Sequence, residues 1–170
     1  MKSFFKLTKL FVAVAFVSII TSCSSSDGDG NPFDDAPSGE IVSVEKRQLA
    51  LTGFSDSPES GETQKWWTHV TSKITVNGPE ECGEDVTENN LGYLAFYPDG
   101  GIYARTSRTG PITPGGFWEW ANSDKNAIVT QGINFTITYL NDTNVVYASV
   151  QSSGPCSATT YEQFNDPFSD

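Results

Sequence analysis

The chain has 170 residues, of which 10 are basic and 21 acidic, so its formal net charge is −11. Nucleic acid and anionic lipid surfaces repel such a chain, which argues against both as partners. The sequence contains a single histidine, no Gly-x-Ser-x-Gly elbow and no phosphate-binding loop. We therefore expect that the protein is not an enzyme and has no catalytic residue.

Residues 1–22 have the layout of a secretory signal peptide, with flanking lysines and an apolar run from Leu10 to Ile20. This run is much shorter than the roughly 20 residues of a membrane-spanning helix. The following Ile20-Thr21-Ser22-Cys23 resembles the bacterial lipobox. The resemblance implies cleavage before Cys23, with a diacylglycerol on its thiol and an acyl chain on its amino group. We expect no other cofactor.

Residues 23–40 are predicted to be a flexible, acidic tether, because they offer almost nothing to bury. Cleavage would remove three of the 10 basic residues and no acidic one, which leaves a charge of −14. An acidic Ser/Asp/Gly stretch after a lipidated cysteine resembles the surface-export signal of Bacteroidetes lipoproteins. The resemblance implies a protein anchored at the outer membrane, on its outer face.

Residues 41–170 are predicted to form one β domain, because apolar residues repeatedly alternate with polar ones between turn signals, as in Ile133–Leu140. No segment shows a helical stripe with caps. An antiparallel up-and-down meander that closes into a barrel of eight strands is expected, with a β-sandwich as the alternative. Strands are expected at Ile41–Leu51, Trp66–Val76, Gly92–Tyr97, Ile102–Thr106, Phe117–Trp120, Ala127–Thr130, Ile133–Leu140, Val145–Val150 and Thr159–Phe164.

Cys82 and Cys156 are the two cysteines left once Cys23 is lipidated. In an oxidising compartment they are expected to form a disulfide. With His69 as the only histidine and no Cys-x-x-Cys pattern, no metal site is expected. His69 itself is predicted to lie at the surface or to take part in a structural hydrogen bond.

Three short motifs follow one another along the chain. In their order, the stretch of about residues 62–151 resembles the small lipocalin-like domains of Bacteroidetes lipoproteins. The motifs are Gln64-Lys65-Trp66-Trp67, Phe96-Tyr97-Pro98-Asp99-Gly100 and Gly116-Phe117-Trp118-Glu119-Trp120. The resemblance implies an eight-stranded up-and-down barrel, in a group of proteins whose activity is mostly unassigned.

The candidate ligand-binding residues are Trp66, Trp67, Trp118 and Trp120. Trp118 and Trp120 are predicted to share one face of a strand, because successive side chains alternate. Such rings can fill a barrel as core, line an apolar cup inside it, or stack on sugar rings from outside. Glu119 can point either way.

The first functional hypothesis is a surface lipoprotein whose barrel binds a small apolar or carbohydrate ligand. The second is a protein-interaction subunit of an outer-membrane assembly, and the third is a protease inhibitor that uses a rigid loop around residues 109–115. A tryptophan-lined cavity would favour the first hypothesis. A filled interior with an exposed apolar patch would favour the second, and a protruding loop would favour the third.

Overall fold

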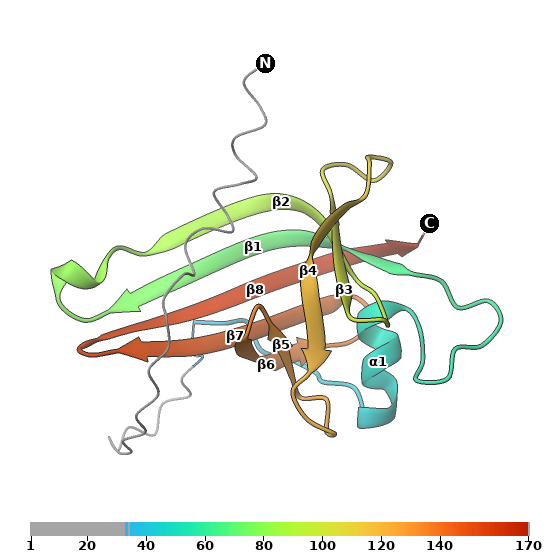
Figure 1. Ribbon diagram of the computed structural model, residues 1–170, viewed down its shortest axis with the longest axis horizontal. Coiled ribbons are helices and arrows are strands. Elements are labelled where there is room, and N and C mark those ends of the chain that lie inside the picture. Colours follow the sequence, from blue (N-terminus) through green and yellow to red (C-terminus); the bar gives the residue numbers. More distant parts are fainter. Residues whose placement is uncertain (1–32, 34, 170) are drawn as a thin grey trace.

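The computed structural model describes residue 33 and residues 35–169, so the predicted signal peptide and Cys23 lie outside the described part. The barrel prediction is confirmed, and the sandwich alternative is excluded. Eight antiparallel strands close in chain order, and the last strand pairs with the first (Figure 1). The elements are α1 (Val44–Thr52), β1 (Lys65–Asn77), η1 (Glu80–Cys82), β2 (Val86–Phe96), β3 (Gly101–Arg105), β4 (Thr113–Trp120), β5 (Ala127–Thr130), β6 (Ile133–Leu140), β7 (Asn144–Ser153) and β8 (Cys156–Ser169).

Tight turns make the predicted hairpins. Gln131 and Gly132 join β5 to β6 with φ angles of 52° and 78°, as a two-residue turn of this twist requires. Asn141 begins the turn between β6 and β7, where its side-chain oxygen accepts hydrogen bonds from the backbone N–H groups of Thr143 and Asn144, both at 2.9 Å. These turns keep consecutive strands adjacent and fix their register.

Four of the strands are much longer than the others. β3 pairs with β2 only at residues 93–96, and β6 pairs with β7 only at residues 145–148. Beyond these points β2, β1, β8 and β7 continue side by side as an open four-stranded sheet, which we call the extension (Figure 1). The predicted strands lie at the right places but are too short. The prediction begins β2 at Gly92 instead of Val86, and it ends β8 at Phe164 instead of Ser169.

The predicted strand at Ile41–Leu51 is wrong. Only Ile41 bridges to the sheet, at Leu140, and α1 follows instead. The run from Glu45 to Leu51 consists of good helix formers, and Gly53 ends the helix in the left-handed conformation with φ 86°. The alternating valines and polar residues at the start of this segment imitate a strand.

The predicted tether is also wrong for residues 35–39, which lie against the outer face of the barrel. The Gly39 N–H donates to the Thr138 carbonyl, and the Thr138 hydroxyl donates to the Pro37 carbonyl. Ala36 is buried on Val146 and Ala148. Small and apolar residues within a polar segment were enough to attach it to β6 and β7.

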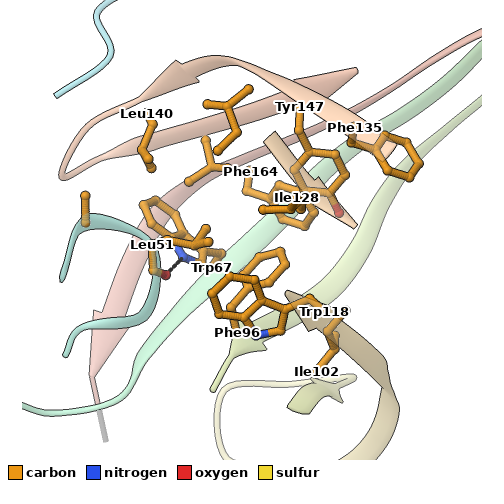
Figure 2. Close-up of a cluster of buried hydrophobic side chains, with 13 residues drawn as sticks. Leu51, Trp67, Phe96, Ile102, Trp118, Ile128, Phe135, Leu140, Tyr147 and Phe164 are labelled. Atoms are coloured by element: carbon orange, nitrogen blue, oxygen red, sulfur yellow. Dashed lines mark hydrogen bonds between the residues drawn. The ribbon is translucent and has the colours of Figure 1, made fainter. Parts of the chain in front are cut away.

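Thirteen buried side chains fill the interior of the barrel, and α1 contributes two of them (Figure 2). They are Ala50, Leu51, Trp67, Phe96, Ile102, Trp118, Ile128, Phe135, Ile137, Leu140, Val145, Tyr147 and Phe164. The ring of Phe96 packs edge-on against three others, with centroids 5.7 to 6.2 Å apart. The barrel therefore has a packed aromatic core, with the helix at one end.

The predicted disulfide between Cys82 and Cys156 is confirmed, with an S–S distance of 2.00 Å. It links η1, in the connection between β1 and β2, to the first residue of β8. The bond therefore ties together the two hairpins that form the tip of the extension.

Candidate ligand-binding site

The four candidate tryptophans occupy three different environments. Trp67 is fully buried inside the barrel, where its indole N–H donates to the Leu51 carbonyl at 2.8 Å (Figure 2). This hydrogen bond attaches α1 to β1. Trp67 is therefore a core residue and cannot contact a ligand without unpacking the helix.

Trp66 points the opposite way, as alternation along β1 requires, yet it is also fully buried. The ring of Phe168 stacks on it with a centroid distance of 6.5 Å, and the Arg105 guanidinium lies 3.9 Å from its centroid. Tyr97 meets its edge. Trp66 thus joins the end of β8 to β2 and β3, which is a structural role on the outside of the barrel.

Trp118 and Trp120 share one face of β4, as predicted, and pack edge-to-face with ring centroids 5.3 Å apart. The Trp118 N–H donates to the Tyr97 carbonyl at 2.9 Å, and the Trp120 N–H donates to the Gln48 side-chain oxygen at 2.6 Å. Both indoles are thereby fixed in orientation, since each has used its one polar group within the protein.

A pocket of about 310 Å³ opens beside these two rings, at the end of the barrel where α1 lies. Its lining comes from α1, from the turn between β2 and β3, and from the end of β4. The lining residues are Gln48, Pro98, Asp99, Gly100, Trp118, Glu119 and Trp120. The two indoles, the Gln48 side chain and the turn with Asp99 therefore border one open space, and Glu119 lies between the two tryptophans on β4 with its exposed side chain on the other face of the strand. Of the predicted ligand-binding residues, only Trp118 and Trp120 belong to it.

The turn between β2 and β3 holds its shape through Asp99 and Gly100. One oxygen of the Asp99 carboxylate accepts a hydrogen bond from the Gly101 N–H at 2.9 Å. Gly100 has φ 90°, and a Cβ there would lie 3.0 Å from the Trp118 carbonyl oxygen. A side chain at Gly100 would therefore be strained and would crowd the pocket wall.

Gln48 is not among the predicted site residues, because the pattern of residues 41–51 predicts a strand. Asp99 and Gly100 enter the prediction only within the motif of residues 96–100. An alternation argument can pair Trp118 with Trp120, but it cannot bring them to residues of α1.

A second polar group lies inside the barrel toward the extension. His69 is buried, and its Nε2 lies 2.6 Å from the Glu162 carboxylate, whose other oxygen accepts a hydrogen bond from Ser72 at 2.9 Å. Burial raises the pKa of Tyr147 well above its usual value, and the nearby Glu162 charge raises it further. The expected structural hydrogen bond of His69 is thus present, although the residue is not at the surface.

Across residues 35–169, no group of three His, Cys, Asp or Glu side chains gathers in a way that could hold a metal ion. In the same described part of the chain, none of the helices has the length and apolar character to cross a membrane. The acidic residues around Cys82 are exposed.

Comparison of the chain with models of known protein families, with curated proteins and with solved structures found no match. The pocket must therefore be interpreted from its own chemistry.

Proposed function

We propose that this chain is a lipid-anchored protein of the outer membrane that binds a neutral carbohydrate in the pocket beside Trp118 and Trp120. The observation that carries the proposal is the composition of this pocket, which combines the half-buried indole of Trp120, packed on the buried indole of Trp118, with the carboxylate of Asp99. Its volume of about 310 Å³ is at the lower end of the range for small-molecule sites.

The chemistry of a sugar ring matches this lining. One face of a pyranose presents C–H groups that pack on an aromatic ring, and its hydroxyls are donors that carboxylate and amide oxygens accept. Asp99, which is exposed, supplies such oxygens at the pocket, whereas the Gln48 side-chain oxygen already accepts the Trp120 N–H. Because the whole chain is strongly acidic and the Asp99 carboxylate lies at the site, anionic sugars are disfavoured relative to neutral or amino sugars.

An apolar ligand inside the barrel fits the structure less well. The inner positions are occupied by thirteen buried side chains, and the indole of Trp67 is hydrogen-bonded to α1. Such a ligand would have to displace packed rings. Burial of each ring stabilises the fold by roughly 1.5–3 kcal/mol, and this free energy would be lost. The pocket between α1 and β4 needs no such displacement.

Replacing Trp120 by alanine is expected to weaken binding of a neutral oligosaccharide at least tenfold, which corresponds to about 1.4 kcal/mol. The ring supplies a stacking surface that alanine lacks. Isothermal titration calorimetry against a panel of neutral and amino-sugar oligosaccharides measures the effect. Phe117→Ala is the matched control, because Phe117 lies on the same strand, is 79% exposed and does not line the pocket. Equal affinity in the Trp120 and Phe117 variants would contradict the proposed site, as would a panel without any ligand.

Replacing Cys23 by alanine is expected to move the protein from the membrane fraction to the soluble fraction, because the residue that carries the lipid is lost. Two or three acyl chains hold a protein on a membrane stably, whereas a protein without acyl chains has only its polar domain to contact the membrane. Cell fractionation with immunoblotting measures the change. Ser22→Ala is the control and should stay with the membrane, since it keeps a small residue before the cysteine. Persistence of the Cys23 variant in the membrane would reject lipid anchoring.

A further inference from the structure

The extension has two open edges with very different properties. Within the part of the chain that the structure describes, residues 86–92 of β2 pair with β1 on one side and with no strand on the other. Residues 149–153 of β7 likewise pair with β8 on one side and with no strand on the other. Backbone N–H and C=O groups on such an edge are ready to pair with another strand.

The β2 edge is irregular and charged. Asn90 and Gly92 have φ angles of 57° and 99°, and the pairing register with β1 shifts between His69 and Thr71. Glu88 lies within this edge. Irregular backbone and charge are features that protect an edge strand from pairing with other chains.

The β7 edge has none of these features. Its exposed part is Val150-Gln151-Ser152-Ser153, which has no proline and no charge, whereas Ser149 is buried, and the pairing with β8 is regular throughout. The whole of residues 148–161, which we call the β7–β8 arm, contains no Asp, Glu, Lys, Arg or His, although 18% of the chain is charged. Val150 is 43% exposed. An unprotected edge of this kind is a liability unless something covers it.

We propose that the β7 edge pairs with the β7 edge of a second copy of this chain, in antiparallel orientation. An isologous contact of this type closes after two copies and leaves no further edge to extend the assembly on that side. Two copies of this chain are both strongly acidic, at −11 each for the full sequence and −14 each after cleavage before Cys23, and therefore repel one another over most of their surfaces. The uncharged arm is the part of the fold where they can approach without that cost.

The shape of the chain allows this contact. The extension projects beyond the short strands β3–β6, so two arms can meet while the barrels stay apart (Figure 1). Pairing would join the two extensions into one continuous sheet, and the Cys82–Cys156 bond holds each arm to its own β1–β2 connection. The carbohydrate pocket lies at the opposite end, beside α1, so this proposal does not depend on the proposed function.

Native mass spectrometry of the protein purified in detergent from the cells that make it, with or without a lipid on Cys23, tests the proposal. The wild-type protein is expected to be a dimer. Val150→Lys and Ser152→Lys are expected to make it a monomer, because each places two like charges at the paired edges. Thr87→Lys is the matched control, since Thr87 is an exposed residue of the β2 edge, and this variant should remain a dimer.

Hydrogen–deuterium exchange supplies the second measurement. Amides of residues 150–153 that point away from β8 are expected to exchange slowly in the wild-type protein and rapidly in the Val150 variant, while the barrel amides stay unchanged. A monomeric wild-type protein would overturn the proposal. A dimer that survives both lysine substitutions in β7, or one that is lost in the Thr87 variant, would equally overturn it.

Discussion

Replacement of Cys82 and Cys156 by serine is expected to lower the free energy of unfolding by about 4 kcal/mol. The bond joins positions 74 residues apart, and in the chain-entropy model a loop of this length restricts the unfolded chain by roughly that amount. The effect is large against the 5–15 kcal/mol that is typical of a folded domain. Urea unfolding followed by tryptophan fluorescence measures it.

Two controls separate the bond from the residues. Reduction of the wild-type protein should produce the same loss as the double substitution, and reduction of the double variant should change nothing further. A loss below about 1 kcal/mol would show that the extension is held mainly by its strand pairing, and it would contradict the role given to the disulfide.

Replacement of Trp67 by alanine is expected to destabilise the fold by about 3–5 kcal/mol, the range for removal of a large aromatic residue from a packed core. Trp67 is fully buried and, like Lys65, is a residue of β1 that donates a hydrogen bond to a carbonyl of α1. Trp67→Phe should cost less, about 1–3 kcal/mol, because it keeps a ring but leaves the Leu51 carbonyl without its donor. Thermal or urea unfolding gives both values.

Phe117→Ala provides the comparison for this prediction, since its ring is 79% exposed and its removal should change stability by less than about 0.5 kcal/mol. If Trp67→Ala were equally mild, Trp67 would have to be available for binding, and the description of the barrel as filled would be wrong.

Local patterns were sufficient to predict the barrel. The alternation in Ile133–Leu140 separates inward from outward side chains, and Asn141 marks the turn that follows. The same alternation places Trp118 and Trp120 on one face. Because neighbouring strands are joined by short turns, correct hairpins lead directly to the correct order of strands.

Contacts between distant segments could not be predicted in this way. Gln48 meets Trp120 across 72 residues, and His69 meets Glu162 across 93. The segment before the barrel was also misread, because its helix is too short to show a full amphipathic stripe and takes its stability from packing on the barrel. The open extension went unrecognised because residues 87–90 of β2 are polar on both faces of the strand.

The central claim, that a neutral carbohydrate binds beside Trp118 and Trp120, is tested most directly by the indole N–H signals of the ¹⁵N-labelled protein. The chain has 4 tryptophans, and single substitutions assign the 4 signals. On titration with a neutral oligosaccharide that binds, the signals of Trp118 and Trp120 are predicted to shift, while those of Trp66 and Trp67 stay in place. Shifts confined to Trp66 or Trp67, or no shift with any sugar of the panel, would contradict the claim.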